Sequence, residues 1–222
     1  MTLREASARF LELRNPKNPR SNKAQAQTIQ LLTTFFPDAA LAELTPARLR
    51  DFIARWYVEE TNHQPAPAAL LNSLDDFISW VDTQTPAEAE GGCRSVIVEL
   101  EETLPRALEI ARVLSSELKT RGAFGFPEFL TSFEEGGRSQ YDVDVGGDVS
   151  ALEGFFRVSR IDETMVEAEE LISGERVSPI VFPKESAAVI ATGYIINLEL
   201  VRAGYNWHIA ACGFAYPPGT EF

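Results

Sequence analysis

Cysteine is scarce in this chain of 222 residues, which holds only Cys93 and Cys212. Two cysteines far apart in the chain do not make the closely spaced framework of a disulfide-stapled secreted domain. The first residues also lack the charged start, apolar stretch and small-residue cleavage site that a signal peptide needs. We therefore expect a reducing, cytoplasmic environment.

Long apolar runs are missing as well. A membrane-spanning helix needs about 20 consecutive apolar residues, and the segment ALLNSLDDFISWV is interrupted by Asp75 and Asp76. The sequence therefore predicts no membrane partner. Hydrophobic residues still make up 45% of the chain, which is enough to bury a core in one large or two small domains.

Histidine is almost absent, and catalytic motifs are missing. The two histidines are His63 and His208, and the chain contains no HExxH, GxGxxG, GxxxxGK[ST] or GxSxG motif. A strand over 206–215 would place His208 and Cys212 on one face, but two ligands do not complete a zinc site. A Cys–His nucleophile pair would also need an orienting group and an oxyanion site. We expect no enzymatic activity and no cofactor.

Positive charge is scarce after the first 60 residues. The chain has 20 Lys and Arg against 33 Asp and Glu, a net charge of -13. Residues 1–60 hold nine basic against seven acidic side chains, so residues 61–222 hold eleven against twenty-six. No Lys or Arg occurs between Arg55 and Arg94. Because such a surface repels a phosphate backbone, any nucleic-acid contact must lie near the N-terminus.

Residues 1–85 carry the signals of four short helices. Thr2 and Glu5 make a capping box for the first, and the prolines of NPKNP end it. Thr45 is placed to cap the third helix, with proline at its first position. The predicted helices run from 2 to about 14, over 21–36, from 46 onward, and from about 67 to 81. Together they predict a four-helix orthogonal bundle.

Residues 86–135 are expected to form a linker and a helical connector. PAEAEGG is the candidate linker. The next segment repeats apolar residues at alternating spacings of three and four, with Ile97, Leu100, Leu104, Leu114 and Leu118 in the stripe. This stripe either packs within its own subunit as a helical hairpin or binds a second copy of the chain. Pro105 either kinks the helix or opens a second one.

In residues 136–222 the apolar period changes to two. The segments YDVDV, EGFFRVSRI, TMVEAEELI, RVSPIVF, GYIINLELV and NWHIAACGFAY are β-branched or aromatic and separated by turn residues. PKESAAVIA reads as a short helix between strands. The sequence therefore predicts an α+β protein whose C-terminal part is a small antiparallel β-barrel or sandwich.

The helical part resembles a known family. TLREASARFLEL, a Pro/Asn-rich joint, SNKAQAQTIQLLTTFF, LAELTPARLRDFIARW and LLNSLDDFISWV together look like the core-binding (SAM-like) domain at the N-terminus of tyrosine recombinases, or phage integrases, over about residues 2–85. The resemblance implies a bundle of about four helices that forms one jaw of a clamp around DNA.

The chain departs from that family at positions that matter for DNA. Ala24 and Gln27 stand where the second helix of the family usually has a Thr and a Tyr. Ala68, Ala69 and Asp75 stand where its fourth helix often has basic residues. The catalytic half is also missing, because neither histidine belongs to a His-x-x-Arg element. We do not expect recombination by this chain.

One basic segment remains for nucleic acid. It consists of Arg14, Lys17, Arg20 and Lys23, with asparagines between them. These side chains could make a few phosphate contacts, which position a protein on DNA but do not read bases. The alternative is a solvated loop between two helices.

A candidate calcium site lies in DVDVGGDVSALE, residues 142–153. Asp142, Asp144, Asp148 and Glu153 occupy positions 1, 3, 7 and 12 of an EF-hand loop. Position 5 is a glycine, and the residues that follow read as a strand rather than as an exiting helix. A Gly-Gly hairpin with solvent-facing aspartates explains the same letters.

Two further carboxylate pairs have the spacing of catalytic carboxylates, but we expect them on the solvent-exposed (wet) face of a sheet. Asp142 with Asp144, and Glu167 with Glu169, alternate with apolar residues as the exposed face of a sheet does. The function we expect is that of a non-enzymatic interaction or regulatory protein. A DNA-binding accessory protein and a calcium-responsive module are the alternatives.

Overall fold

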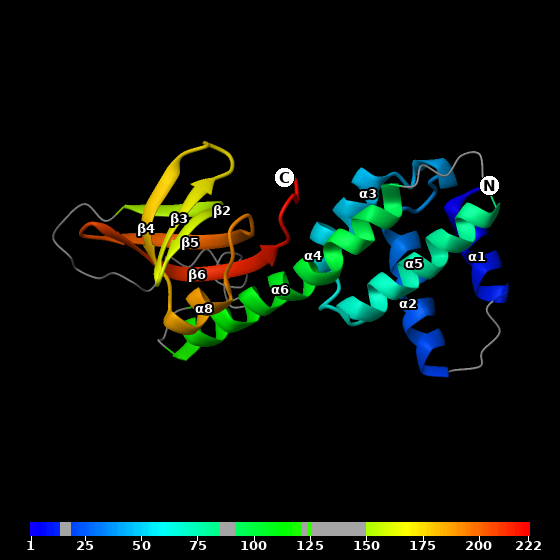
Figure 1. Cartoon of the computed structure of the whole chain (residues 1–222), viewed down its shortest axis with the longest axis horizontal. Coiled ribbons are helices and arrows are strands. Elements are labelled where there is room, and N and C mark those ends of the chain that lie inside the picture. Colours follow the sequence, from blue (N-terminus) through cyan, green and yellow to red (C-terminus); the bar gives the residue numbers. More distant parts are fainter. Residues whose placement is uncertain (14–18, 85–91, 121–123, 126–149) are drawn as a thin grey trace, which may run out of the picture. The chain divides into compact units, whose positions relative to one another are not determined.

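The computed structural model describes residues 1–13, 19–84, 92–120, 124–125 and 150–222. It has a mixed α+β fold and divides into two compact units, an N-terminal unit (1–105 with 220–222) and a C-terminal unit (106–219) (Figure 1). This differs from the three parts expected, because the boundary falls inside one helix, α6 (Gly92–Thr120), after Pro105. The connector is therefore not a separate part of the chain.

The four predicted helices of the N-terminal unit are all present. They are α1 (Leu3–Leu13), α2 (Pro19–Phe35), α3 (Pro46–Asp51), which continues through the π-helical turn η2 (Phe52–Trp56) into α4 (Tyr57–Glu60), and α5 (Pro67–Gln84). A short 3-10 turn, η1 (Leu41–Glu43), precedes α3. Helix α2 begins before Ser21, the residue expected to cap it, because proline fits the first turn of a helix.

The predicted caps account for where the helices start. The Thr2 hydroxyl accepts a hydrogen bond from the Glu5 amide at 3.2 Å, and the Glu5 carboxylate accepts one from the Thr2 amide at 2.9 Å. This is the reciprocal capping box that the sequence predicts. The Thr45 hydroxyl accepts from the Arg48 amide at 3.4 Å in the same way.

Large aromatic side chains fill the core of the N-terminal unit. Phe10 of α1 meets Phe77 of α5 edge-on, with ring centroids 5.3 Å apart. The ring centroids of Phe36 and Phe52 lie 6.4 Å apart, and both side chains are buried. Tyr57 is fully buried and donates its hydroxyl proton to the carbonyl oxygen of Pro65 at 2.6 Å, so its polar end is satisfied.

Helix α6 runs without interruption through Pro105, so the proline does not open a second helix. Pro105 lies on the exposed side, where water can hydrate the carbonyl that its missing N–H leaves unpaired. The five residues considered for self-association are buried within the chain: Ile97 is 2% exposed, Leu100, Leu104 and Leu114 0%, and Leu118 3%. A second copy cannot reach them without opening a core, so the prediction of self-association through this stripe is wrong. The five side chains pack within the chain, and they belong to one helix rather than to a helical hairpin.

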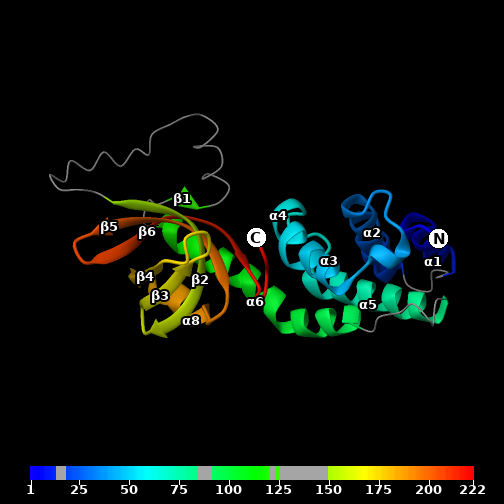
Figure 2. The ribbon, with the colours of Figure 1, turned by 90° about the horizontal axis from the view of Figure 1, so that it is seen from above.

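The C-terminal unit contains a sheet whose order is β1-β6-β4-β3-β2-β5, with a further pairing of β6 to β5. The strands are β1 (Phe124–Gly125), β2 (Ala151–Asp162), β3 (Met165–Glu170), β4 (Arg176–Val181), β5 (Ile195–Ala203) and β6 (Asn206–Tyr216) (Figure 2). Strands β2 to β6 match the last five predicted segments, and YDVDV lies outside the described residues.

The sheet is mixed, not antiparallel as predicted. Pairings run in a ring from β6 through β4, β3, β2 and β5 back to β6, and the β4–β6 pairing is parallel. A ring of five strands cannot alternate direction at every step, because five is an odd number. One parallel pairing is therefore a geometric consequence of the ring, which the direction of single strands does not reveal.

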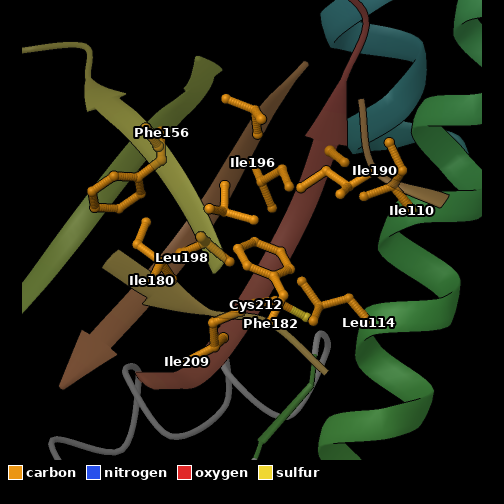
Figure 3. Close-up of a cluster of buried hydrophobic side chains, with 14 of the residues drawn as sticks. Ile110, Leu114, Phe156, Ile180, Phe182, Ile190, Ile196, Leu198, Ile209 and Cys212 are labelled. Carbon is orange, nitrogen blue, oxygen red and sulfur yellow. The ribbon is translucent and has the colours of Figure 1, made fainter. Parts of the chain in front are cut away.

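The core of this unit lies between the sheet and α6. Ile110 and Leu114 point from α6 toward Ile196, Ile190 and Cys212 (Figure 3). These five side chains are at most 4% exposed. Full burial of a leucine or isoleucine stabilises a fold by about 1.5–3 kcal/mol. The C-terminal half of α6 is thus part of the hydrophobic core of this unit.

A polar contact also joins α6 to the short helix α8 (Lys184–Val189), which matches the predicted helix in PKESAAVIA. The Glu117 carboxylate accepts hydrogen bonds from the Glu185 amide at 3.2 Å, from the Ser186 amide at 2.7 Å, and from the Ser186 hydroxyl. Ser186 is fully buried. One carboxylate therefore satisfies three donors at the start of α8.

We expect Glu117→Ala to destabilise the C-terminal unit by about 2 kcal/mol, because buried donors at Ser186 lose their acceptor. Urea denaturation, with hydrogen exchange of the α8 amides, measures the effect. Glu109→Ala on the same helix is the matched control, since Glu109 is an exposed partner of Arg112 and such pairs contribute little. An equal loss of stability in both variants would contradict the capping role.

Candidate functional site

The structure describes little of the predicted nucleic-acid segment. Arg14 and Lys17 lie outside the described residues, and Arg20 belongs to α2 but its side chain is not among those described. Lys23 lies on α2 and is exposed. The prediction for the segment as a whole therefore stays a prediction.

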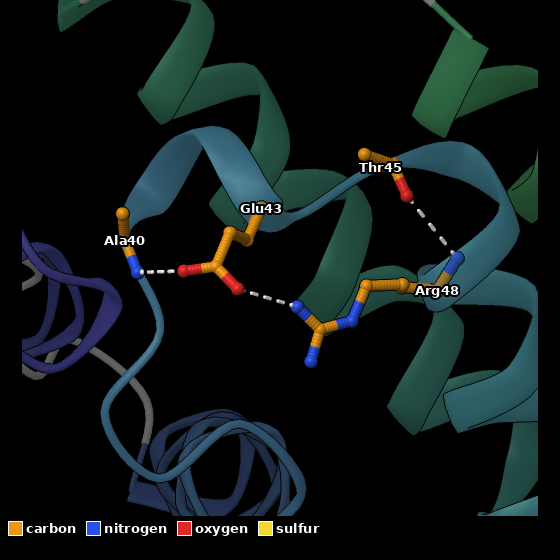
Figure 4. A network of polar contacts seen from close by, with 4 residues as sticks. All are labelled: Ala40, Glu43, Thr45 and Arg48. Carbon is orange, nitrogen blue, oxygen red and sulfur yellow. Dashed lines mark hydrogen bonds and ion pairs between the residues drawn. The ribbon is translucent and has the colours of Figure 1, made fainter.

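Arginines elsewhere in the N-terminal unit are held by carboxylates. Arg48 donates to Glu43 at 2.9 Å, and Glu43 also accepts from the Ala40 amide at 2.9 Å (Figure 4). Further ion pairs join Arg4 to Asp38, Arg50 to Glu99, Arg55 to Asp51 and Arg94 to Asp75. These pairs neutralise cations that a phosphate backbone would otherwise attract.

The calcium prediction does not have its expected context. Asp142, Asp144 and Asp148 lie outside the described residues. Glu153 lies within β2, and this strand continues after Glu153, where an EF-hand would have its exiting helix. No group of three or more His, Cys, Asp or Glu side chains that could hold a metal occurs in the part of the chain that the structure describes. The strand after Glu153 differs from the helix that an EF-hand requires, and calcium binding by the four residues stays a prediction.

Glu153 instead lies directly opposite Glu199 of β5. Like charges at opposite positions of neighbouring strands destabilise a sheet. Burial of Glu199, and next the Glu153 carboxylate, raise the pKa of Glu199 above its ordinary range. The sheet thus tolerates a like-charge pair on its outer face.

The other predicted carboxylate pair on the sheet lies opposite arginines of the neighbouring strand. Glu167 pairs with Arg160 at 3.6 Å and Glu169 with Arg157 at 3.8 Å, both between β2 and β3. The interpretation of Glu167 and Glu169 as the wet face of a sheet is confirmed. The adjacent Glu170 accepts hydrogen bonds from two amides of the turn that follows β3, at 3.0 and 2.7 Å.

His208 and Cys212 do not share a face. Glu199 of β5 pairs with Ala211, and the residue after it, Leu200, pairs with Ile209. Strand β6 therefore has one extra residue at this point. Such a bulge inverts the alternation of side chains. As a result His208 is exposed, whereas Cys212 is 1% exposed in the core, with its sulfur 3.4 Å from the Ser115 hydroxyl.

Sequence reasoning missed the aromatic group that is most exposed among the described residues of the C-terminal unit, at the turn between β5 and β6. We name residues Arg202–Trp207 the β5–β6 tip. Ala203 pairs with Asn206, which leaves Gly204 and Tyr205 as a two-residue turn, and Gly204 has a φ of +64°. A glycine in the first position is typical of such turns. The hairpin turns beyond the ends of β3 and β4 (Figures 1 and 2).

The β5–β6 tip contains an exposed tyrosine and a contact between an arginine and a tryptophan. Tyr205 is 90% exposed. Arg202 pairs with Trp207 across the two strands, and its guanidinium carbon lies over the indole ring, 5.8 Å from the centroid. Tyr, Trp and Arg are the residue types that most often dominate the binding energy of protein interfaces. The signal in the sequence was RAGYNW, a glycine-first turn with an aromatic or basic residue at each flank.

Comparisons of the chain with protein-family models, with curated proteins and with solved structures found no match. No helix among the described residues has the length and apolar content needed to cross a membrane.

We expect Glu199→Gln to raise the melting temperature at neutral pH. The folded-state pKa of Glu199 is raised, so its neutral form favours the fold; that contribution is complete below the unfolded pKa of about 4.3 and is lost as the pH rises through the folded pKa. Glutamine keeps the side chain neutral at every pH. The gain should therefore vanish near pH 4, as thermal melts at the two pH values would show.

Glu175→Gln, at an exposed turn of the same unit, is the matched control and should change neither melting curve. A stabilisation by Glu199→Gln of the same size at both pH values would show that the charge of Glu199 is not the cause.

Proposed function

We propose that the protein is a non-enzymatic interaction protein that contacts a protein partner through the β5–β6 tip. The observation that carries the proposal is Tyr205, a large aromatic side chain that is 90% exposed in the hairpin turn whose flanking strands carry an arginine over a tryptophan. A tyrosine has few rotatable bonds, so a partner can bury much area at a small cost in conformational entropy.

Groups with catalytic potential elsewhere in the unit have structural roles, which supports a binding function. Glu117 caps α8, Glu170 closes the turn after β3, and Cys212 packs in the core. Each of these side chains is engaged by neighbours that hold the fold together. Arg202 and Tyr205 of the β5–β6 tip, by contrast, are exposed to solvent.

The finer fold is part of the proposal. We take the helices of the N-terminal unit for an orthogonal bundle similar to a recombinase core-binding domain, on the helix order and the caps. We take the ring of pairings among β2 to β6 for a small barrel. Under this proposal the barrel supports the hairpin on a rigid base, which limits the entropy lost on binding.

DNA binding through the basic segment is the second candidate function, and exposed Lys23 favours it. It requires duplex binding at low salt that Lys17→Glu with Arg20→Glu weakens, together with a shallower dependence on salt. Absence of duplex binding at low salt would remove this candidate. The paired arginines of the N-terminal unit are the reason for placing it second.

The test of the interaction proposal is site-specific photocrosslinking in cells that express the chain. A photoreactive phenylalanine analogue at position 205 should crosslink a discrete partner, because Tyr205 lies at the centre of the proposed contact. The matched control is the same analogue at Ile172, which is 87% exposed at another turn of the same unit. The crosslink at 205 should also disappear in the Arg202→Ala background.

Crosslinks of equal yield from positions 172 and 205 would contradict the proposal, and so would a complete lack of crosslinks from 205. Circular dichroism of each variant checks that the fold is unchanged. The readout depends on position within one unit and thus separates a specific contact from general surface adhesion.

A further inference from the structure

We infer that the partner of the β5–β6 tip presents a carboxylate next to an apolar side chain, as an acidic peptide segment does. This inference rests on the proposed function and names the chemistry that the site recognises. The juxtaposition that motivates it is a guanidinium held over an indole ring at one side of the turn and an exposed phenol at its apex.

Arg202 is available to an acceptor from outside. It is exposed, and among the described residues it forms no ion pair. Arg157 and Arg160, also on the strands of this unit, are by comparison engaged by Glu169 and Glu167. A guanidinium over an aromatic ring keeps the N–H groups at its edge available, and this planar fork matches the two oxygens of a carboxylate.

Tyr205 supplies the apolar half of the recognition. Its ring is 90% exposed and follows Gly204 in the turn, so little of its apolar area is already buried by the chain. Aromatic side chains bury about 150–250 Å² when they are fully covered. A partner that offered only charge would leave this ring in water, so the fit requires an apolar neighbour beside the carboxylate.

The charge of the unit favours a carboxylate over a nucleic acid. Residues 106–219 hold ten Lys and Arg against seventeen Asp and Glu, a net charge of -7. A phosphate chain would bring several charges within the screening length of about 8 Å and meet repulsion from this surface. A peptide with one or two carboxylates engages Arg202 at short range and brings far less repulsion.

The experiment is a selection of short random peptides displayed on phage against the full-length chain, followed by affinity measurements on the enriched peptides. We expect enrichment of Asp or Glu next to an apolar residue. Replacing that acidic residue by its amide should weaken binding to the unaltered chain about tenfold or more, because a charge-assisted pair is lost. The same replacement should have little effect on binding to Arg202→Gln, which already lacks the fork.

Matched controls are Arg160→Gln, an arginine of the same unit with an internal partner, and Ile172→Ala, an exposed apolar residue at another turn. Both should bind the peptides as the unaltered chain does. Tyr205→Ala should weaken every selected peptide, acidic or not. Circular dichroism of each variant verifies the fold.

The outcomes separate the inference from the function on which it rests. Peptides that need Tyr205 but have no acidic residue would overturn the inference and leave the proposed function standing. Peptides that bind regardless of Tyr205 and Arg202, or no peptides at all, would overturn both. Binding of a single-stranded oligothymidylate that is lost in Arg202→Gln would overturn the inference in favour of a polyanion.

Discussion

The burial of one face of α6 is the constraint on which both units depend. Leu100 and Leu104 are buried in the N-terminal unit, and Leu114 is buried in the core of the C-terminal unit. Pro105 lies between them on the exposed side, where its effect on the backbone can be relieved by water. Because both cores need this face, it is unavailable to a partner, and function must be sought on other surfaces.

The arginine side chains that the structure describes in the N-terminal unit are mostly paired with carboxylates. The chain has a large acidic excess, yet most described arginines of the N-terminal unit contact a carboxylate. This arrangement stabilises the surface locally and lowers its attraction for phosphate. At the β5–β6 tip of the C-terminal unit, Arg202 contacts an aromatic ring instead of a carboxylate.

The sequence predicts local structure well here, because local chemistry decides it. The capping box at Thr2, the cap at Thr45 and the period of two along β2 to β6 each depend on residues close together in the chain. The sequence does not decide whether the apolar residues of α6 pack within the chain or against a second copy, since the same heptad pattern suits both. Burial resolves that ambiguity, and it is a property of the folded chain.

Features that depend on strand pairing could not be predicted. The extra residue of β6 that separates His208 from Cys212 and the parallel pairing of β4 with β6 both arise from register between distant segments. The β5–β6 tip was missed for another reason, because Tyr205 and Trp207 are also typical strand residues. The glycine of RAGYNW is a signal for a turn, and the pairing of Ala203 with Asn206 fixes Tyr205 within it.

The central claim is that one face of α6 completes two separate cores, and hydrogen exchange of two variants tests it most directly. Leu114→Ala should accelerate exchange across β2 to β6 and leave α1 to α5 unchanged, and Leu100→Ala should do the reverse, because each variant opens a cavity in one core. Contradiction would come from variants that keep both cores protected and instead lower the molar mass of an oligomer, since the stripe would then bind a second copy.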